Sequence, residues 1–325
     1  MNKNFISKLL EQHDFINVYE IGSRGGAFSD LKKYEKYVDY VGFEANEDEC
    51  NLLNKSAGKN KRFYKETYYP KAVGGHIERP KFHITNQPGC SSFLEPNHEI
   101  LEFFGRNEWF KTKSIKEIKT STLLELKKEL NLKNPDFLKI DVEGMDLEIL
   151  KGLGNDIDSI LGLRMEINYL DHRKEQSSIG DVFAFLQKKG FYIFGFLENN
   201  SWRTDNLVSD QYFKLFDINF SKGQLAHGDI LAFKNPIDLI YSSKFSLSSK
   251  IKYAALLDSY GFISHVKMVT ESPAFQKIFS KKQMLINRKY LVQSSRYLFF
   301  SRILDLITDF FSYLKTNLII IIKRK

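Results

Sequence analysis

Short apolar runs recur through the first 235 residues, separated by stretches whose apolar positions have helical spacing. This alternation of strand-like and helix-like periodicity is typical of βαβ units, in which helices join parallel strands. It favours an α/β fold with a doubly wound, mostly parallel, seven-stranded sheet over a sandwich or a helix bundle. The runs predict strands at residues 18–21, 40–44, 63–64 together with 72–73, 137–140, 160–167, 191–194 and 229–233, with an extra strand at 81–85.

Helical spacing predicts helices at residues 28–37, 123–130, 147–150 and 182–189, and a further helix through residues 52 and 53. Residues 88–104 fit neither pattern and contain the turn pairs Pro88-Gly89 and Pro96-Asn97. Because long irregular insertions often cover a binding site, we expect this excursion to lie over one.

The pattern changes after Asn235-Pro236, because the following residues have helical periodicity, few glycines and many lysines and aromatics. We therefore predict a first domain at 1–235 and a helical region at 236–325. One wide apolar face of this region either packs on protein or lies on a membrane surface. The apolar positions of that face are Phe299, Phe300, Ile303, Leu304, Ile307, Phe310, Phe311, Leu314 and Leu318.

The composition is that of a folded protein, with 42% hydrophobic and 27% charged residues among 325. The net charge is +8, but lysines are scattered among acids, so we expect no nucleic-acid partner. Cys50 and Cys90 lack the spacing of a zinc site and are expected to be reduced thiols of a cytoplasmic protein. Lys8 and Glu11 interrupt the apolar start, and no long apolar window follows, so we expect neither a secretory signal nor a transmembrane helix.

A glycine-rich turn follows the first predicted strand, in the run Glu20-Ile21-Gly22-Ser23-Arg24-Gly25-Gly26. Glycines let the backbone turn sharply and approach a ligand closely. Glu44 ends the second predicted strand, where a carboxylate can accept both hydroxyls of a ribose. These features indicate a nucleoside ligand, either a dinucleotide or S-adenosylmethionine. The dinucleotide motif requires glycine where Arg24 stands, which disfavours the first.

Two acids follow the strand predicted at 137–140, because Asp141 and Glu143 precede Gly144. Ligands bind beyond the carboxyl ends of parallel strands, so these acids are candidates for chemistry. The alternative is that Asp141 caps the next helix and Glu143 is solvated. If the acceptor is a hydroxyl, a base must take its proton; Asp141 is the first choice, ahead of Glu143, His83 and His227.

Several segments resemble the FkbM-type methyltransferases. They are residues 18–26, Phe43-Glu44-Ala45-Asn46, Lys71-Ala72-Val73-Gly74, Cys90-Ser91-Ser92 and, most specifically, residues 136–144. The similarity extends over about residues 15–235. It implies a class I methyltransferase fold with seven strands and S-adenosylmethionine as the cofactor.

The resemblance also implies roles for individual residues. Asp141 and Glu143 match strand-end acids beside the reacting centre, and Glu166 matches an acid in the fifth strand. Related O-methyltransferases hold a divalent cation on such acids, so Asp141 with Glu143 or Glu166 is a candidate metal site. The implied cofactor-binding residues are Glu20, Gly22, Ser23 and Gly26 at the methionine end, Glu44, Ala45 and Asn46 at the ribose, and Ala72 and Val73 near the adenine.

The resulting hypothesis is a methyltransferase that methylates a hydroxyl oxygen of a sugar, a glycan or another polar metabolite. A nicotinamide-dependent oxidoreductase, or a non-catalytic scaffold that binds a partner or membrane through residues 237–325, are the alternatives. A small-molecule or glycan acceptor is expected. The protein is expected in the cytoplasm, with residues 297–325 as a candidate contact to the inner face of the membrane, and oligomerisation stays open.

Overall fold

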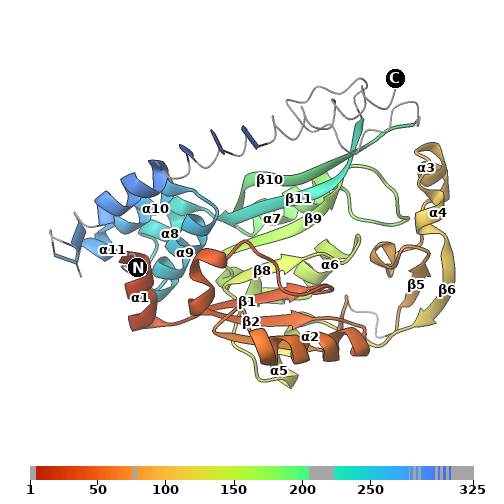
Figure 1. The fold of residues 1–325 in the computed structure, drawn as a ribbon, viewed down its shortest axis with the longest axis horizontal. Helices are drawn as coiled ribbons and strands as arrows, with labels where there is room; N and C mark the ends of the chain where they lie inside the picture. Colours follow the sequence, from red (N-terminus) through yellow and green to blue (C-terminus); the bar gives the residue numbers. More distant parts are fainter. Residues whose placement is uncertain are drawn as a thin grey trace.

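The structure is a computed structural model, which describes residues 5–75, 79–204, 223–277, 279–280, 283–284, 287–296, 299–300, 303–304 and 307–308. Its centre is a seven-stranded sheet in the order β10-β11-β9-β8-β1-β2-β3 (Figure 1). The strands of this sheet are β1 (Ile16–Ile21), β2 (Val38–Phe43), β3 (Lys65–Tyr69), β8 (Phe137–Ile140), β9 (Gly162–Asn168), β10 (Phe191–Trp202) and β11 (Gln224–Lys234).

The five strands from β3 to β9 are parallel, and β11 and β10 are added antiparallel at one edge. The predicted doubly wound, mostly parallel seven-stranded sheet with a helical C-terminal region is therefore confirmed. Chain order runs outward in both directions from β1 and β8. In open α/β sheets such a switch point is where ligands bind.

Side chains along the strands alternate between two buried cores, one on each face of the sheet. In β1, Val18 points to one face, and Tyr19 and Ile21 point to the other. Both faces are covered, which explains why the strands read as almost continuous apolar runs. The first face carries α1 (Phe5–His13), η1 (Lys32–Tyr37), α2 (Glu47–Asn60), α8 (Pro236–Tyr241), α9 (Leu247–Ser259), α10 (Ile263–Thr270) and α11 (Pro273–Gln276), and the second carries α5 (Leu123–Glu129), α6 (Asp146–Lys151), η3 (Gly154–Ser159) and α7 (Ile179–Lys188).

The predicted helix at 28–37 and the predicted strand at 63–64 with 72–73 differ from the observed elements. The helix predicted at 28–37 is a 3-10 helix, η1, and Tyr34 inside it has non-helical dihedral angles. Residues 63–64 precede β3 rather than forming it. β4 (Ala72–Val73) pairs with β7 (Thr120–Ser121) in a separate two-stranded sheet, because the chain turns away from the main sheet after β3.

The irregular segment predicted at 88–104 is part of a longer insertion, residues 81–117, which forms a layer of its own between β4 and β7 and is called the excursion from here on. Its strands β5 (Lys81–Thr85) and β6 (Thr112–Glu117) pair antiparallel. Between them lie η2 (Pro88–Cys90), α3 (His98–Phe103) and α4 (Asn107–Phe110). Figure 1 shows this layer at one end of the molecule and α1 with α8 to α11 at the opposite end.

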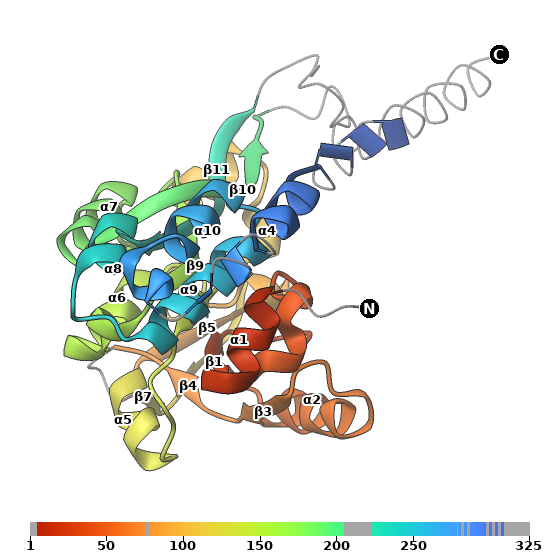
Figure 2. The same cartoon turned by 90° about the vertical axis from the view of Figure 1, so that its left-hand side faces the viewer.

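The C-terminal helices share one core with the sheet. Phe137 and Phe233 from the sheet lie in the same buried cluster as Tyr253 and Leu257 of α9 and Val266 of α10. Figure 2, turned by 90°, shows α8, α9 and α10 gathered beside β9 and β10. The boundary predicted at 235 thus marks a change in secondary structure but no separate core.

Part of the predicted amphipathic face is described beyond these helices. Phe299, Phe300, Ile303, Leu304 and Ile307 are all exposed. The remaining positions of that face, Phe310, Phe311, Leu314 and Leu318, lie outside the described residues. Among the helices in the described part of the chain, none combines the length and apolar character needed to cross a bilayer.

Candidate active site

A cleft of about 350 Å³ lies at the carboxyl ends of β1, β2 and β8. It contains seven of the residues that the sequence assigned to cofactor or chemistry: Gly22, Glu44, Ala45, Ala72, Val73, Asp141 and Glu143. Other walls come from the glycine loop and the excursion. They include Arg24, Lys71, Phe82, Gly89, Ser91 and Phe93.

Gly22 brings the loop after β1 against the loop after β8. Its φ angle is +83°, and a Cβ at this position would overlap the backbone carbonyl oxygen of Asp141. Its N–H donates to the carbonyl of Phe43 at 3.0 Å, which ties the loop to the end of β2. Only glycine therefore fits this position.

Glu44 and Ala45 line the cleft where β2 ends. Glu44 Oε1 accepts the N–H of Asn46 at 2.8 Å, and burial raises the pKa of this carboxyl. Asn46 is the N-cap of α2, where its Oδ1 accepts the N–H of Glu49 at 3.0 Å. Among the described residues that line the cleft, Asn46 is absent, so it supports Glu44 from outside.

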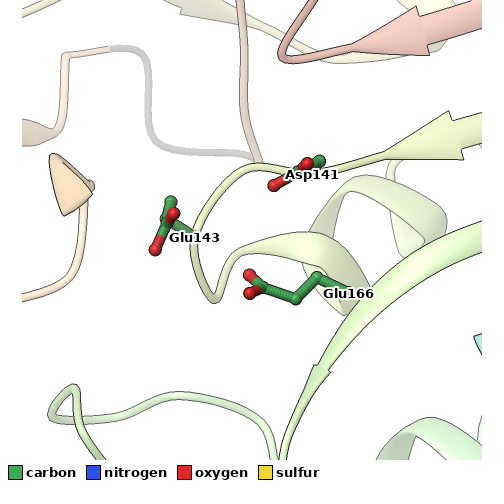
Figure 3. Close-up of side chains that lie close together, drawn as sticks. All are labelled: Asp141, Glu143 and Glu166. Atoms are coloured by element: carbon green, nitrogen blue, oxygen red, sulfur yellow. The ribbon is translucent and has the colours of Figure 1, made fainter. Parts of the chain in front are cut away.

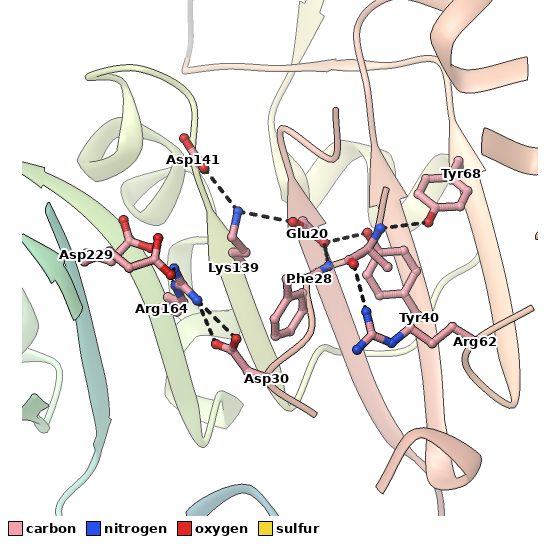
Figure 4. Close-up of polar contacts among 12 residues, drawn as sticks. Glu20, Phe28, Asp30, Tyr40, Arg62, Tyr68, Lys139, Asp141, Arg164 and Asp229 are labelled. Atoms are coloured by element: carbon pink, nitrogen blue, oxygen red, sulfur yellow. Dashed lines mark hydrogen bonds and ion pairs between the residues drawn. The ribbon is translucent and has the colours of Figure 1, made fainter. Parts of the chain in front are cut away.

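Glu20 is 2% exposed and lies on the opposite side of β1 from Ile21. It accepts the Tyr40 hydroxyl at 2.7 Å and the N–H of Phe28 at 3.0 Å, and its other oxygen lies 3.2 Å from Lys139 Nζ (Figure 4). Glu20 is not among the described residues that line the cleft. Among the described residues, Lys139 links it to the site.

Lys139 joins Glu20 to the cleft, because its Nζ also lies 3.1 Å from Asp141 Oδ2 (Figure 4). Burial acts to lower the pKa of Lys139, but the carboxylates of Glu20 and Asp141 outweigh it and raise the pKa. The raised pKa favours the ammonium form of Lys139, which pairs with Asp141 and holds it in place.

Ser23 and Gly26 shape the glycine loop. Ser23 is fully buried and donates its N–H to the carbonyl of Phe43 at 3.1 Å, and Gly26 donates its N–H to Ser23 at 3.0 Å with φ of +101°. Neither Ser23 nor Gly26 is among the described residues that line the cleft. Both fix the turn that carries Gly22.

A second cavity, of about 460 Å³, adjoins the cleft and shares Gly89 and Glu143 with it. Its walls come from the excursion, from the ends of β8 and β9, and from β10 and β11. The lining residues are Gln87, Gly89, Cys90, Trp109, Phe110, Glu143, Glu166, His172, Trp202 and His227.

Three carboxylates meet where the two spaces join (Figure 3). Asp141, Glu143 and Glu166 each offer an oxygen within 4.8 Å of the others. Each also has a basic partner: Lys139 for Asp141, Arg173 for Glu143, and His227 Nδ1 at 3.0 Å for Glu166. The cluster can accept a proton from a hydroxyl or supply oxygen ligands to a divalent cation.

Burial raises the pKa of Glu143 and Glu166. The negative charge of Asp141 raises the pKa of both carboxyls further, and Arg173 acts in the opposite direction. For Glu166, the neighbouring Glu143 adds to the effect, so its pKa lies well above the usual range. Like charges so close together disfavour full ionisation.

Glu143 has a left-handed backbone, with φ of +60°, and Gly144 follows with +102°. Such a conformation in a residue other than glycine is costly and is often retained at functional sites. The Ser92 hydroxyl donates to the Glu143 carbonyl at 2.8 Å, and the Arg173 guanidinium binds the carboxylate. These contacts hold Glu143 at the junction of cleft and cavity.

The family model for the methyltransferase FkbM domain matches residues 20–193. That segment is more than half of the chain and contains all the strand-end acids of the site. The chain belongs to this family. It is therefore a methyltransferase of the S-adenosylmethionine-dependent class, and the interpretation as a nicotinamide-dependent oxidoreductase is no longer supported.

Solved structures resemble this FkbM domain only distantly. Magnesium protoporphyrin IX methyltransferase of Synechocystis PCC 6803, with bound S-adenosylmethionine, has a TM-score of 0.35 and 10% identity over 71% of this chain and 78% of that one. M. capricolum TrmK, in complex with S-adenosylhomocysteine, has a TM-score of 0.32 and 12% identity over 90% of this chain and 98% of that one. A putative tRNA (m1A22) methyltransferase of Streptococcus pneumoniae has a TM-score of 0.34 and 11% identity over 89% of this chain and 94% of that one. No curated protein matches the sequence.

The two histidines proposed as lesser bases lie in different places. His227 lines the larger cavity, and burial lowers its pKa, so that its ring tends to be neutral. His83 is 9% exposed, and its backbone pairs with Ser92 through bonds of 2.8 and 3.2 Å. His83 is missing from the described lining of either space, and it supports Ser92 instead.

Sequence reasoning missed the aromatic wall and Arg173. Trp109 and Phe110 lie in α4, just beyond the segment predicted as irregular at 88–104, where the aromatic content of residues 103–110 was a usable signal, and Trp202 ends β10. Arg173 and His172 lie in the loop after β9, in a segment without periodicity. Nothing in their local sequence indicated that they would reach the site.

Proposed function

We propose that this FkbM domain moves a methyl group from S-adenosylmethionine to a hydroxyl oxygen of a sugar, a glycan or another polar metabolite. The observation that carries the proposal is the meeting of two spaces at Gly89 and Glu143, with three carboxylates beside the junction. A donor in one space and an acceptor in the other would face each other there.

The smaller cleft fits the donor. Gly22 leaves room for the methionine end, the Glu44 carboxylate accepts ribose hydroxyls, and Ala72 and Val73 contact the adenine. Ala45 completes the ribose wall. In this proposal Glu20, Ser23, Gly26 and Asn46 position these residues and do not touch the donor.

Methyl transfer is an in-line displacement. The acceptor oxygen forms a bond to the methyl carbon, the carbon–sulfur bond breaks, and its electron pair stays on sulfur. The hydroxyl proton passes to Asp141, with Glu143 holding the acceptor at the junction. Orientation of the reactants supplies much of the acceleration, of the order of 7 to 11 kcal/mol.

Tritiated S-adenosylmethionine, incubated with the protein and a deproteinised extract of the cells that make it, tests the proposal. We expect label in a small-molecule or glycan fraction as a methyl ether. Asp141→Asn should lower the rate by about 10²-fold or more, the usual contribution of a general base. Asp158→Asn is the matched control, because the Asp158 side chain is 67% exposed. Label on nitrogen, or no transfer by a protein that binds donor, would contradict O-methylation, and the second result would favour a scaffold.

A divalent cation on Asp141, Glu143 and Glu166 is the second candidate for this cluster. The spacing of the three oxygens within 4.8 Å favours it, and the basic partner of each carboxylate competes with it. Electron paramagnetic resonance with Mn²⁺ decides whether this cluster binds a cation or acts without one. If the protein binds one Mn²⁺ ion and Glu166→Gln abolishes this binding, the cluster is a metal site. If all the Mn²⁺ stays free throughout the titration, the cluster does not use a cation.

We also propose that residues 297–325 contact the inner face of a membrane. The exposure of Phe299, Phe300, Ile303, Leu304 and Ile307 supports this contact, since apolar side chains with neighbouring basic residues bind lipid surfaces. Flotation with anionic liposomes should carry the full chain but not a chain that ends after Arg296. Equal flotation of the two would remove the idea.

A further inference from the structure

The larger cavity is the space that the proposed function leaves for an acceptor, so the identity of its ligand rests on that function. We infer that this cavity binds an uncharged, polyhydroxylated ring, such as an unmodified hexose residue. Three properties of its described walls support this chemical class: aromatic surface, an unsatisfied buried oxygen and a lining without lysine or arginine.

Aromatic side chains form the first of these features. Trp109 is 47% exposed, and Trp202 is 6% exposed in the wall. The Trp202 ring centroid lies 5.4 Å from that of His172 and 6.2 Å from that of Phe110. The faces of aromatic rings are electron-rich, so they attract the weakly positive C–H groups on the face of a sugar ring. A wall of this kind favours a saturated ring that presents a face of C–H groups to it.

The polar part of the cavity has an acceptor that needs a donor. Glu166 Oε1 contacts His227, but Glu166 Oε2 is buried and finds no hydrogen-bond partner among the described residues. Buried polar atoms are nearly always hydrogen-bonded, and a carboxylate oxygen accepts a hydroxyl proton well. A ligand hydroxyl would satisfy this atom.

Charge restricts the ligand further. Among the described residues that line the cavity, the formal charges belong to Glu143 and Glu166, and none is lysine or arginine. The cofactor cleft differs, because Arg24 and Lys71 line it. Outside the lining of the cavity, the guanidinium of Arg173 binds Glu143, and that of Arg106 lies over the rings of Trp109 and Trp202. A phosphate or carboxylate on the acceptor ring would lie beside Glu143 and Glu166 with no lysine or arginine in the lining itself, which is unfavourable. The ring should therefore be uncharged.

Tryptophan fluorescence reports this cavity directly, because the chain has only two tryptophans, Trp109 and Trp202, and both line it. The full-length protein, saturated with S-adenosylhomocysteine, is titrated with the methyl glycosides of glucose, galactose and mannose. We expect a saturable emission change with at least one of them. Glucuronate and glucose 6-phosphate should give none at the same concentrations.

Variants locate the effect. Trp109→Phe should weaken glycoside binding at least threefold, and Glu166→Gln should reduce the discrimination against glucuronate. Phe103→Ala, in the same excursion but with a 64% exposed ring, should bind as the wild type does. Circular dichroism checks that each variant is folded.

The outcomes are separable. If none of the three glycosides changes the emission, or if glucuronate or glucosamine binds more tightly than they do, the inference is overturned. A failure of S-adenosylhomocysteine to bind, measured by calorimetry before any sugar is added, would instead contradict the proposed function.

Discussion

Two backbone conformations at single residues shape the active site. Gly22 adopts a positive φ and allows the glycine loop to contact the backbone of Asp141. Glu143 adopts a left-handed conformation that places its carboxylate between the cleft and the cavity. Both positions follow closely after a parallel strand, where the chain leaves the sheet. The site is thus built from local geometry that few residues tolerate.

The first prediction concerns Gly22. Gly22→Ala should lower the affinity for S-adenosylhomocysteine at least tenfold, because the new Cβ would overlap the Asp141 carbonyl. Gly25→Ala is the matched control: its φ is +78°, but nothing lies within 4 Å of the added atom. It should keep the affinity and cost about 1 to 2 kcal/mol of stability from left-handed strain. Calorimetry that finds equal affinities in the two variants would contradict the role of this contact.

A second residue, His172, should make stability depend on pH. Burial lowers its pKa to about 3, far below its ordinary value of 6.5. Between these two pH values His172 is protonated in the unfolded chain but neutral in the folded chain. The free energy of unfolding therefore falls as the pH drops below about 6.5. Urea unfolding of His172→Gln should show a smaller loss between pH 7 and pH 5 than the wild type shows. Parallel curves for the two proteins would exclude the effect.

At the same scale, the sequence predicts position better than orientation. The end of a parallel strand is readable from the sequence, and the structure places Gly22, Glu44 and Asp141, each predicted at such an end, along one cleft. The face toward which Glu20 points is not readable, because both faces of β1 are buried. Arg173 could not be found, since its contact with Glu143 depends on how a loop packs.

At the scale of elements, the excursion and α9 lie at opposite ends of the molecule (Figure 1). The excursion supplies walls to both spaces, through Gly89 for each of them and Trp109 for the cavity. Helix α9 is buried along nearly its whole length and carries Lys252, whose Nζ lies 2.9 Å from Asp136 just before β8. Helical periodicity predicted a helical region at 236–325, but neither the bounds of α9 nor this burial, because the apolar residues of α9 are not confined to one face.

The Lys252–Asp136 ion pair should anchor α9 to the sheet. Lys252→Met leaves a carboxylate that is only 13% exposed without its cation, so unfolding free energy should fall by about 3 to 5 kcal/mol. Lys244→Met, at an exposed position before α9, should change it by less than about 0.5 kcal/mol. Denaturant titration measures both, and a loss below about 1 kcal/mol in the first variant would show that the pair is dispensable.

At the scale of the whole molecule, one core joins the methyltransferase sheet to the C-terminal helices. The cluster that contains Phe137 and Phe233 continues into α9, α10 and Leu291. The change of periodicity at residue 235 is readable from sequence, but the shared core is not, because it depends on contacts between distant segments. The site therefore lies at one end of a unit that includes the C-terminal helices.

Truncation tests this unity. A chain that ends after Asn235 would expose the apolar face that α8 to α10 cover, so it should fail to unfold cooperatively and should aggregate. A chain that ends after Arg296 keeps these helices and should melt within a few degrees of the full chain. Calorimetric melting of the two chains provides the test. A cooperative transition in the shorter chain would show that residues 1–235 fold alone.

The most direct test of the donor site is a crystal structure of the protein with S-adenosylhomocysteine. The ribose hydroxyls should lie within hydrogen-bond distance of the Glu44 carboxylate, with the sulfur near Asp141 and facing the larger cavity. A ligand in the cavity between Trp109 and Trp202, or a cleft that stays empty at saturating ligand, would contradict the assignment.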